Sequence, residues 1–366
     1  MTETAHESFL VPPRSAVDTV VWPALLPEFQ ARLLAVQFQL EQSEWWTPAE
    51  LLEHQFQQLA QVTAHAFRSV PFYRDGLTAA GYREGEPVTP EIWARVPVLG
   101  RKALRENSDA LTSRAIPPAH GKVAELILDP RPPPLLVRKT ELTQIFTQAF
   151  ILREEIWHRR DLAGKQAAIV QDPSGSSRYP AGRSMPDWGP PMGPLYGTGP
   201  LVILDAMSDV SQQMEWLDRE KPAYLAALPD TIAALARRYR AAGKTLPSLL
   251  GVRTGSGTID AEFRALCRAA WGVPVTAIVR IEEVGTVALQ CPQQEQFHVQ
   301  SEGLFLEVLR PDGSACGPGE AGRLVATTLH NFAMPLLRYV LDLAADLGPP
   351  CPCGRGLPVL RRITAV

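Results

Sequence analysis

A regular alternation of strand-like and helix-like segments between residues 165 and 281 constrains the fold of this chain most. The strand-like segments are short apolar runs: QAAIVQ, PLVILDA, PAYLAAL, LLGVRT and VPVTAIVRI. Segments with apolar residues at the helical period lie between them, among them DVSQQMEWLDRE, PDTIAALARRY and AEFRALCRAAWG. Because such alternation is typical of a parallel sheet covered by helices, the sequence predicts an α/β fold.

The rest of the sequence suggests three consecutive parts. Residues 1–47 are interpreted as an N-terminal extension. Residues 48–283 are expected to form helix-covered sheet lobes, with further helices over 48–68 and from about Lys139 to His158. Residues 284–366 contain strand-like runs separated by PDGS and GPGEAG, which predicts a β-rich lobe built as a small sheet or a distorted barrel. Several lobes are expected because 366 residues exceed the ~250–300 at which one core usually divides.

Composition excludes several classes of partner. The chain is 45% hydrophobic and 20% charged, as is usual for a soluble globular protein. Its net charge of −3 gives no reason to expect nucleic acid or an anionic membrane as a partner. The N-terminus, MTETAHESFLVPP, lacks the pattern of a secretory signal, and no apolar run approaches the length of a membrane span, so a cytoplasmic protein is expected.

Several stretches resemble the phenylacetate–CoA ligase branch of the adenylate-forming superfamily. In chain order they are VPFYRDGL, VRKTELTQ, MPDWGPPMGPLYGTGP, EEVGTVALQCP, FHVQSEGLFLEVL, TTLHNFAMPLLRY and CPCGRGLPVL. The resemblance implies the large N-terminal domain of these enzymes, with helix-covered sheets and a small distorted β-barrel. In the family a mobile C-terminal domain follows. We expect it to be absent here, because the sequence stops at LPVLRRITAV, near the family's hinge.

The family's phosphate loop is rich in Gly, Ser and Thr, which bring backbone N–H groups and hydroxyls to the phosphates. Here the corresponding stretch is 127–134, and four of its eight residues are prolines. Proline has no N–H to donate. Asp129, Pro130, Arg131 and Pro132 therefore stand where an ATP-binding loop is expected, and Asp129 adds a negative charge. The resemblance implies that neither ATP nor Mg²⁺ is bound.

Three further nucleotide contacts of the family are replaced. Gly257 stands where the family has a Glu near the adenine, Val279 where an aromatic ring stacks, and Leu343 where an Asp accepts from the ribose. Asp342 is adjacent to Leu343, but neighbouring side chains on a strand point to opposite faces. Glu283 is retained at the position that serves magnesium and phosphate in the family; the alternative is an ordinary surface or cleft carboxylate.

Three cysteines and a histidine have the composition of a zinc site. Six residues separate Cys291 from His298, and Cys351 and Cys353 belong to a C-P-C-G sequence. Three thiolates and one imidazole match tetrahedral Zn²⁺, and the family shows a similar pattern. We expect a structural Zn²⁺ that fastens the C-terminal strands to the β-rich lobe. Purely structural thiols are the alternative, while the odd count of five cysteines argues against a disulfide framework.

These observations lead to a hypothesis and two alternatives. The hypothesis is a pseudo-ligase that cannot adenylate and binds an acyl or aryl group, an acyl carrier protein or a pathway enzyme in specialised biosynthesis. The first alternative is an ATP-independent acyl transferase, cyclase or thioesterase that reuses the inherited pocket; its candidate residues are Ser256, Glu283, His330 and Arg338. Ser256 lies in a Gly-Ser-Gly sequence that is either an anion site or a plain turn. The second alternative is a residual ligase. Members of the family frequently self-associate, so a homo-oligomer is also considered.

Overall fold

The structure, a computed structural model, describes residues 13–255 and 259–366. It contains two compact units, each built from two stretches of chain. The first unit comprises the described residues up to 34 together with 151–278, and the second comprises 35–150 and 279–366. The units therefore do not follow the linear division into 1–47, 48–283 and 284–366, because the chain passes between them within α1, α6 and β8.

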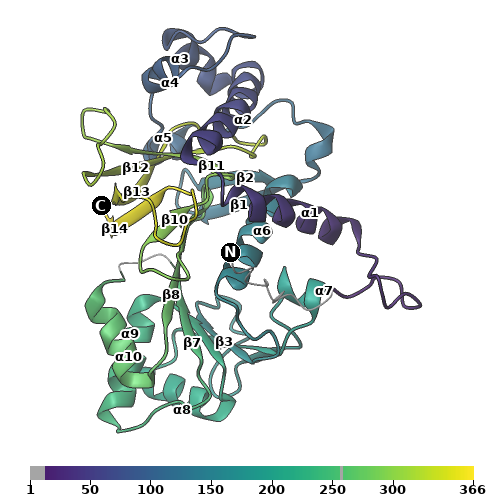
Figure 1. Cartoon of the computed structure of the whole chain (residues 1–366), viewed down its shortest axis with the longest axis vertical. Coiled ribbons are helices and arrows are strands. Elements are labelled where there is room, and N and C mark those ends of the chain that lie inside the picture. Colours follow the sequence, from purple (N-terminus) through teal and green to yellow (C-terminus); the bar gives the residue numbers. More distant parts are fainter. Residues whose placement is uncertain (1–12, 256–258) are drawn as a thin grey trace, which may run out of the picture. The chain divides into compact units, whose positions relative to one another are not determined.

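The first unit contains a mainly parallel sheet (Figure 1). Its strands lie in the order β4-β5-β3-β6-β7-β8, and β4 at the edge is antiparallel. Their bounds are β3 Gln166–Val170, β4 Arg183–Met185, β5 Leu201–Asp205, β6 Tyr224–Ala227, β7 Gly251–Thr254 and β8 Val275–Ile281. The parallel sheet expected from the strand–helix alternation is thus confirmed.

Three helices cover this sheet and share its apolar core. They are α8 (Val210–Glu220), α9 (Pro229–Ala241) and α10 (Ala261–Trp271), while the short α7 (Met192–Tyr196) precedes β5. Asp209 begins α8 as expected, since its side chain accepts from the backbone N–H groups of Ser211 and Gln212. Trp216, Tyr239 and Cys267 are fully buried among strand residues. This shared core holds the three helices against the sheet of the first unit.

The second unit contains an antiparallel sheet with strand order β9-β10-β14-β13-β12-β11. The bounds are β9 Gly285–Gln290, β10 Phe297–Val299, β11 Leu304–Leu309, β12 Ala321–Thr328, β13 Tyr339–Leu347 and β14 Val359–Ala365. Register shifts interrupt the pairing of β12 with β13 and of β13 with β14. The β-rich region expected after residue 284 is therefore an antiparallel sheet.

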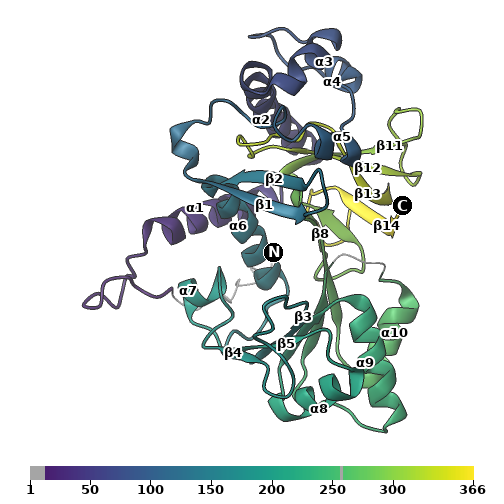
Figure 2. The same ribbon diagram turned by 180° about the vertical axis from the view of Figure 1, so that it is seen from behind.

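A separate hairpin of β1 (Val123–Asp129) and β2 (Leu135–Thr140) also belongs to the second unit and leads directly into a helix (Figure 2). The helical elements are α1 Glu28–Ser43, α2 Pro48–Ser69, η1 Pro71–Tyr73, α3 Arg74–Ala79, α4 Pro90–Arg95, α5 Arg101–Glu106, η2 Pro118–His120 and α6 Glu141–Trp157. Thr47 and Glu50 form a capping box at the start of α2. The helices predicted over 48–68 and about 139–158 are confirmed as α2 and α6.

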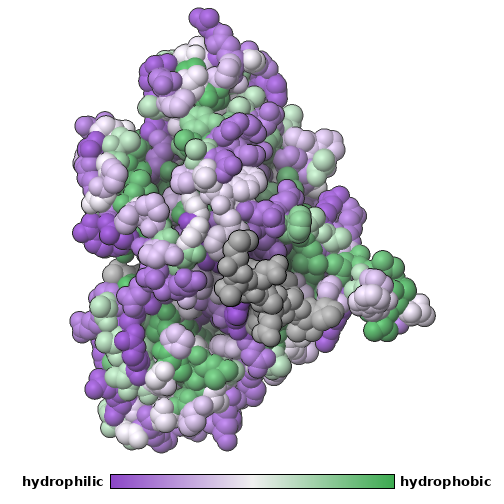
Figure 3. All heavy atoms as spheres, viewed as in Figure 1, coloured by the Kyte–Doolittle hydropathy of each residue, from purple (hydrophilic) through white to green (hydrophobic). Residues whose placement is uncertain are grey.

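Several apolar side chains of the first unit are exposed near the N-terminus. Val21 and Trp22 are 84% and 80% exposed, and Val17 and Leu25 are also largely exposed. The segment before α1 forms the projection on the right of Figure 3, where green marks apolar residues. None of the helices in the described chain has the length and apolar character needed to cross a membrane.

Candidate functional site

The turn between β1 and β2 contains the segment in which the family resemblance implies a phosphate loop. Asp129 pairs with Leu135, and residues 130–134 between the strands have the sequence PRPPP. Because proline has no amide hydrogen, Arg131 supplies the one backbone N–H of this turn. That N–H donates to Asp129 Oδ1 at 3.0 Å. The turn therefore keeps no backbone donor for a phosphate.

Two arginine side chains hold the Asp129 carboxylate. Arg131 donates to it through Nε at 3.0 Å and through Nη2 at 2.6 Å, and Arg105 of α5 donates at 2.5 Å. Arg105 also donates to the carbonyl oxygens of Arg131 and Pro133, each at 3.0 Å. The hydrogen bonds from Arg131, and then those from Arg105, hold the pKa of Asp129 far below its usual range. An ionised carboxylate and its two bound arginines thus close the turn.

Glu283 lies at a pocket of about 250 Å³ within the second unit, where charged residues alternate with apolar ones in the lining. Its Oε1 accepts from Arg101 Nη1 at 2.5 Å and from the Tyr339 hydroxyl at 3.1 Å. The same Arg101 nitrogen lies 3.7 Å from Asp342 Oδ2. Burial, followed by the charge of Glu283, raises the pKa of Tyr339, so its hydroxyl stays protonated and can donate. One arginine therefore offsets two carboxylates that would otherwise attract a cation.

The structure describes some of the residues that the resemblance places at nucleotide-binding positions. Val279 and Leu343 are both buried. Leu343 pairs with Ala365 on β14, and its neighbour Asp342 is exposed, as the alternation of side chains along a strand predicts. Ser256 and Gly257 lie outside the described residues.

Arg338 is buried in a closed set of hydrogen bonds. Its guanidinium makes a bidentate pair with Glu307, with both contacts at 3.0 Å. It also donates to the carbonyl oxygens of Ala94 and Val96. Trp93 Nε1 donates to the same Glu307 carboxylate at 3.2 Å. These contacts give Arg338 a structural role that joins β13 to α4.

His330 is stacked on Phe146, with 3.8 Å between the ring centroids and 4° between the planes. Its Nε2 lies 2.8 Å from the carbonyl oxygen of Glu302, which fixes the proton on Nε2. Burial lowers the pKa of His330 to about 4. At neutral pH this side chain is an uncharged hydrogen-bond donor, which makes it a weak general base.

The structure brings together a serine and a histidine that are 48 positions apart in sequence. Ser113 Oγ lies 3.0 Å from His65 Nε2, a contact that we did not expect from the sequence. However, His65 Nε2 is also 2.9 Å from the carbonyl oxygen of Phe332, so this nitrogen carries the proton. Ser113 Oγ itself donates to the carbonyl oxygen of Ala115 at 3.0 Å. The arrangement therefore does not activate Ser113 as a nucleophile.

Lys139 is a buried cation that sequence reasoning did not identify. It lines a cavity of about 30 Å³ together with Thr143, Thr147 and Glu283. Lys139 Nζ donates to the carbonyl oxygen of Glu282 at 2.5 Å, and burial lowers the pKa of the lysine. The first turns of α6 thus present hydroxyl groups, and β2 presents an ammonium group, to the loop that carries Glu283.

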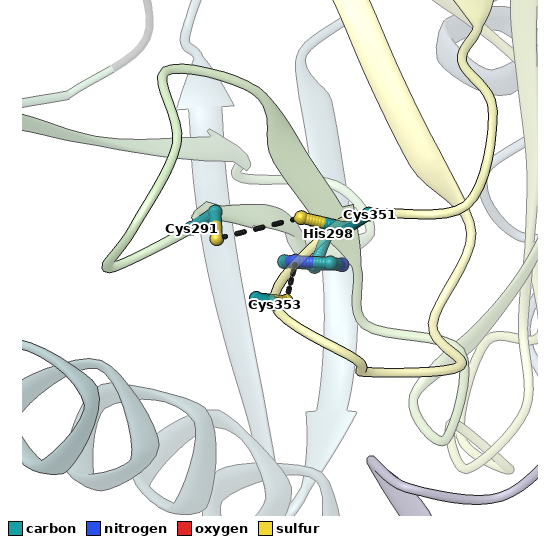
Figure 4. A group of neighbouring side chains, drawn as sticks. All are labelled: Cys291, His298, Cys351 and Cys353. Atoms are coloured by element: carbon teal, nitrogen blue, oxygen red, sulfur yellow. Dashed lines mark hydrogen bonds between the residues drawn. The ribbon is translucent and has the colours of Figure 1, made fainter.

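Cys291, His298, Cys351 and Cys353 come together in the second unit (Figure 4). Cys291 follows β9, His298 lies on β10, and the other two cysteines lie between β13 and β14. Their potential ligand atoms all lie within 4.8 Å of one another. The Cys291 and Cys351 sulfurs are 3.7 Å apart, and Cys353 Sγ is 3.3 Å from His298 Nε2. Tetrahedral zinc with Zn–S distances of about 2.3 Å places two sulfurs about 3.8 Å apart, which agrees with this spacing.

The surroundings of the cluster also suit a metal ion. His298 is fully buried, and its Nδ1 lies 3.3 Å from the carbonyl oxygen of Leu357. In the tautomer that donates from Nδ1 to this carbonyl, Nε2 presents a lone pair toward Cys353. Burial raises the pKa of the Cys291 thiol to about 12. The Cys₃His set could hold a metal ion such as zinc.

Known proteins resemble this chain in part of its sequence and in its fold. No protein-family profile matches the chain. The chain is 31% identical over 143 residues to the phenylacetate-coenzyme A ligase of Thermus thermophilus. This match covers 37% of the chain and 32% of that relative, so the chain matches well under two thirds of the relative's length.

Solved structures share the fold at low sequence identity. An open conformation of 2-hydroxyisobutyryl-CoA ligase in complex with 2-HIB-AMP and CoA matches with a TM-score of 0.69 and 18% identity, over 87% of this chain and 75% of that one. The same enzyme in its thioesterification state matches with a TM-score of 0.70 and 19% identity, over 89% and 70% of the two chains. This chain is thus similar over 143 residues to a phenylacetate-coenzyme A ligase, and it shares its fold with solved CoA ligases.

Proposed function

We propose that this chain is a pseudo-ligase, which keeps the fold of an acyl or aryl CoA ligase but does not form an acyl-adenylate. The observation that carries this proposal is the hydrogen bond from the Arg131 N–H to Asp129. Phosphate loops bind through free backbone N–H groups, and this turn has used its single donor internally.

The environment of Glu283 supports the same proposal. In this superfamily the corresponding glutamate serves magnesium and phosphate, whereas here it accepts from Arg101 and Tyr339. A metal ion would have to displace or share the Arg101 guanidinium. Because Arg101 is itself cationic, the ion pair already satisfies the charge that Mg²⁺ would neutralise.

The function that remains is binding. We propose that the chain binds an acyl or aryl group, presented by an acyl carrier protein or a pathway enzyme in a specialised biosynthetic route. The reason is selective replacement: segments such as HNFAMPLLRY are kept, while the nucleotide contacts at residues 129–132, Val279 and Leu343 are replaced. Co-purification and thermal-shift assays with carrier proteins test this part, and the absence of any complex would count against it.

The Cys₃His cluster is proposed as a structural zinc site. Cys291, His298, Cys351 and Cys353 would fill all four positions of a tetrahedral ion, which leaves none open for a substrate or water. The ion would join the β9–β10 hairpin to the segment between β13 and β14. Its contribution would be to the stability of the second unit.

Carboxylate-dependent exchange of pyrophosphate into ATP tests the proposal directly. The purified chain would be assayed with Mg²⁺ and a panel that includes phenylacetate and 2-hydroxyisobutyrate, beside an active ligase of the superfamily as a positive control. We expect no exchange above the enzyme-free background for any acid. Exchange that depends on one carboxylate and scales with the concentration of the chain would refute the pseudo-ligase proposal.

A further inference from the structure

The second unit contains a large apolar chamber that is separate from the Glu283 pocket. Its volume is about 490 Å³, within the ~300–1,000 Å³ range of small-molecule sites. The C-terminal half of α1 and the first turns of α2 form one side, and the segments after β10 and β12 form the other. From this chamber we infer a second ligand site, which binds a neutral, planar aromatic molecule.

Hydrogen bonds fix the walls of this chamber. Gln55 Nε2 of α2 donates to the carbonyl oxygens of Ser301 and Leu304, at 2.8 and 3.0 Å. Gln58 Nε2 donates to the carbonyl oxygen of Leu329 at 3.0 Å. The amide donors of these lining side chains are thus used to attach α2 to the sheet. The chamber is preformed, and most of its inner surface is apolar although several polar residues line it.

Aromatic and imidazole rings form part of the lining. Trp46 lies 4.5 Å from the His54 ring between centroids, and Phe146 is stacked on His330. Phe38, on the exposed side of α1, adds another ring that is 64% exposed. Flat ring faces and edges favour a planar aromatic ligand, which can stack or pack edge to face against them.

The charge of the lining argues against an anionic ligand. Among the described residues that line the chamber, Glu302 is the one acidic residue, and there is no lysine or arginine. The Ser43 hydroxyl donates to Glu302 Oε1 at 2.6 Å. Transfer of a carboxylate or a CoA phosphate into apolar surroundings without a cationic partner is costly. A neutral molecule avoids that cost.

One polar atom in the wall is unsatisfied. Ser301 is 1% exposed, and its hydroxyl has no hydrogen-bond partner among the described residues. Buried hydroxyls are normally paired, so this group is available to a ligand that carries a donor or an acceptor. The inferred ligand is therefore aromatic and neutral, with one hydrogen-bonding group.

N-phenyl-1-naphthylamine tests the inference, because it is neutral, fluorescent in apolar surroundings and carries one N–H group. We expect saturable binding to the full chain with enhanced, blue-shifted emission. Val36→Trp fills the chamber from α1 and should weaken binding at least about tenfold. Gln57→Trp adds the same ring to α2 outside the lining and should leave binding unchanged. Ser301→Ala should weaken it about fivefold, as the loss of one hydrogen bond predicts.

Three outcomes would overturn the inference. The first is the absence of saturable binding to the wild-type chain. The second is unchanged binding to Val36→Trp, when circular dichroism shows that Val36→Trp and Gln57→Trp are both folded. The third is sedimentation showing that a second copy of the chain occupies this face and excludes the probe. Naphthalene-1-sulfonate, an anionic ring compound, serves as the charge control, and tighter binding of this anion than of the neutral probe would contradict the argument from charge.

Discussion

The backbone N–H of Arg131 donates to the carboxylate of Asp129 at 3.0 Å, and this contact lies in the β1–β2 turn, where the family resemblance implies a phosphate loop. Two arginine side chains reinforce it, one of them from α5. The one backbone N–H of residues 130–134 is therefore held by an internal anion. Hydrogen bonds among Arg105, Asp129 and Arg131 thus hold the proline-rich turn.

Asp129→Ala should release the Arg131 amide. We expect hydrogen–deuterium exchange in a peptide covering residues 127–135 to become at least about tenfold faster, because the amide loses its acceptor. The pKa of Asp129 is depressed, so in the wild type this protection should persist at neutral pH and decline when the carboxyl is protonated in strong acid. Asp312→Ala is the matched control, since Asp312 makes similar contacts with Ser314 in another turn. Equal exchange rates at 127–135 in wild type and Asp129→Ala would contradict this account.

Arg338→Ala should strongly destabilise the chain. The change leaves Glu307 buried without its bidentate partner, and breaking a buried ion pair typically costs ~3–5 kcal/mol. Arg338→Lys should recover only part of this, because an ammonium group does not reproduce the planar fork of arginine. The measurement is the free energy of unfolding from urea titration. Arg310→Ala, which removes an exposed pair with Glu320, should have a small effect; a comparably small effect of Arg338→Ala would show that the buried pair is unimportant.

His330 should make stability depend on pH. Its pKa is about 4 in the folded chain and near 6.5 when unfolded, so the unfolded state takes up a proton first as the pH falls. The free energy of unfolding should therefore decrease by roughly 3 kcal/mol between pH 6.5 and 4 on account of this group, and the contribution should level off below pH 4. His330→Phe retains a ring against Phe146 and should lose this pH-dependent part of the free energy of unfolding. His54 is exposed, so His54→Gln should retain the pH dependence. Parallel stability curves for wild type and His330→Phe would disprove the assignment.

Removal of metal should destabilise the second unit. Protein purified without added zinc is expected to contain one equivalent of Zn²⁺, and a chelator should lower its melting temperature. Cys351→Ala should reduce metal content and stability together, because it removes one of four ligands. Cys316→Ala is the control, since Cys316 lies outside the cluster. Elemental analysis that finds less than half an equivalent of zinc in the wild type would defeat the zinc proposal.

Local patterns predicted much of the fold. The residues T-P-A-E marked the start of α2 because Thr47 and Glu50 form a capping box three residues apart. The strand–helix alternation similarly predicted the parallel sheet of the first unit. Helix α1 was missed, since its apolar residues do not form a clear stripe and residues 1–47 looked like an extension.

Features that depend on distant pairs were not predictable in the same way. Arg105 and Asp129 are 24 positions apart, and Ser113 and His65 are 48 apart, so periodicity contains no sign of their contact. The Cys₃His cluster was predictable because thiols and imidazole form a chemically distinctive set. The burial of Lys139 left no such signal, because an isolated lysine in a sequence is usually exposed.

Titration calorimetry of MgATP into the purified chain tests the central claim most directly. The account predicts no saturable heat at concentrations where an active ligase of the superfamily binds, with or without an acyl or aryl acid. Tight uptake of ATP that requires Mg²⁺ would contradict it and would mean that the Asp129–Arg131 turn opens to accept the nucleotide.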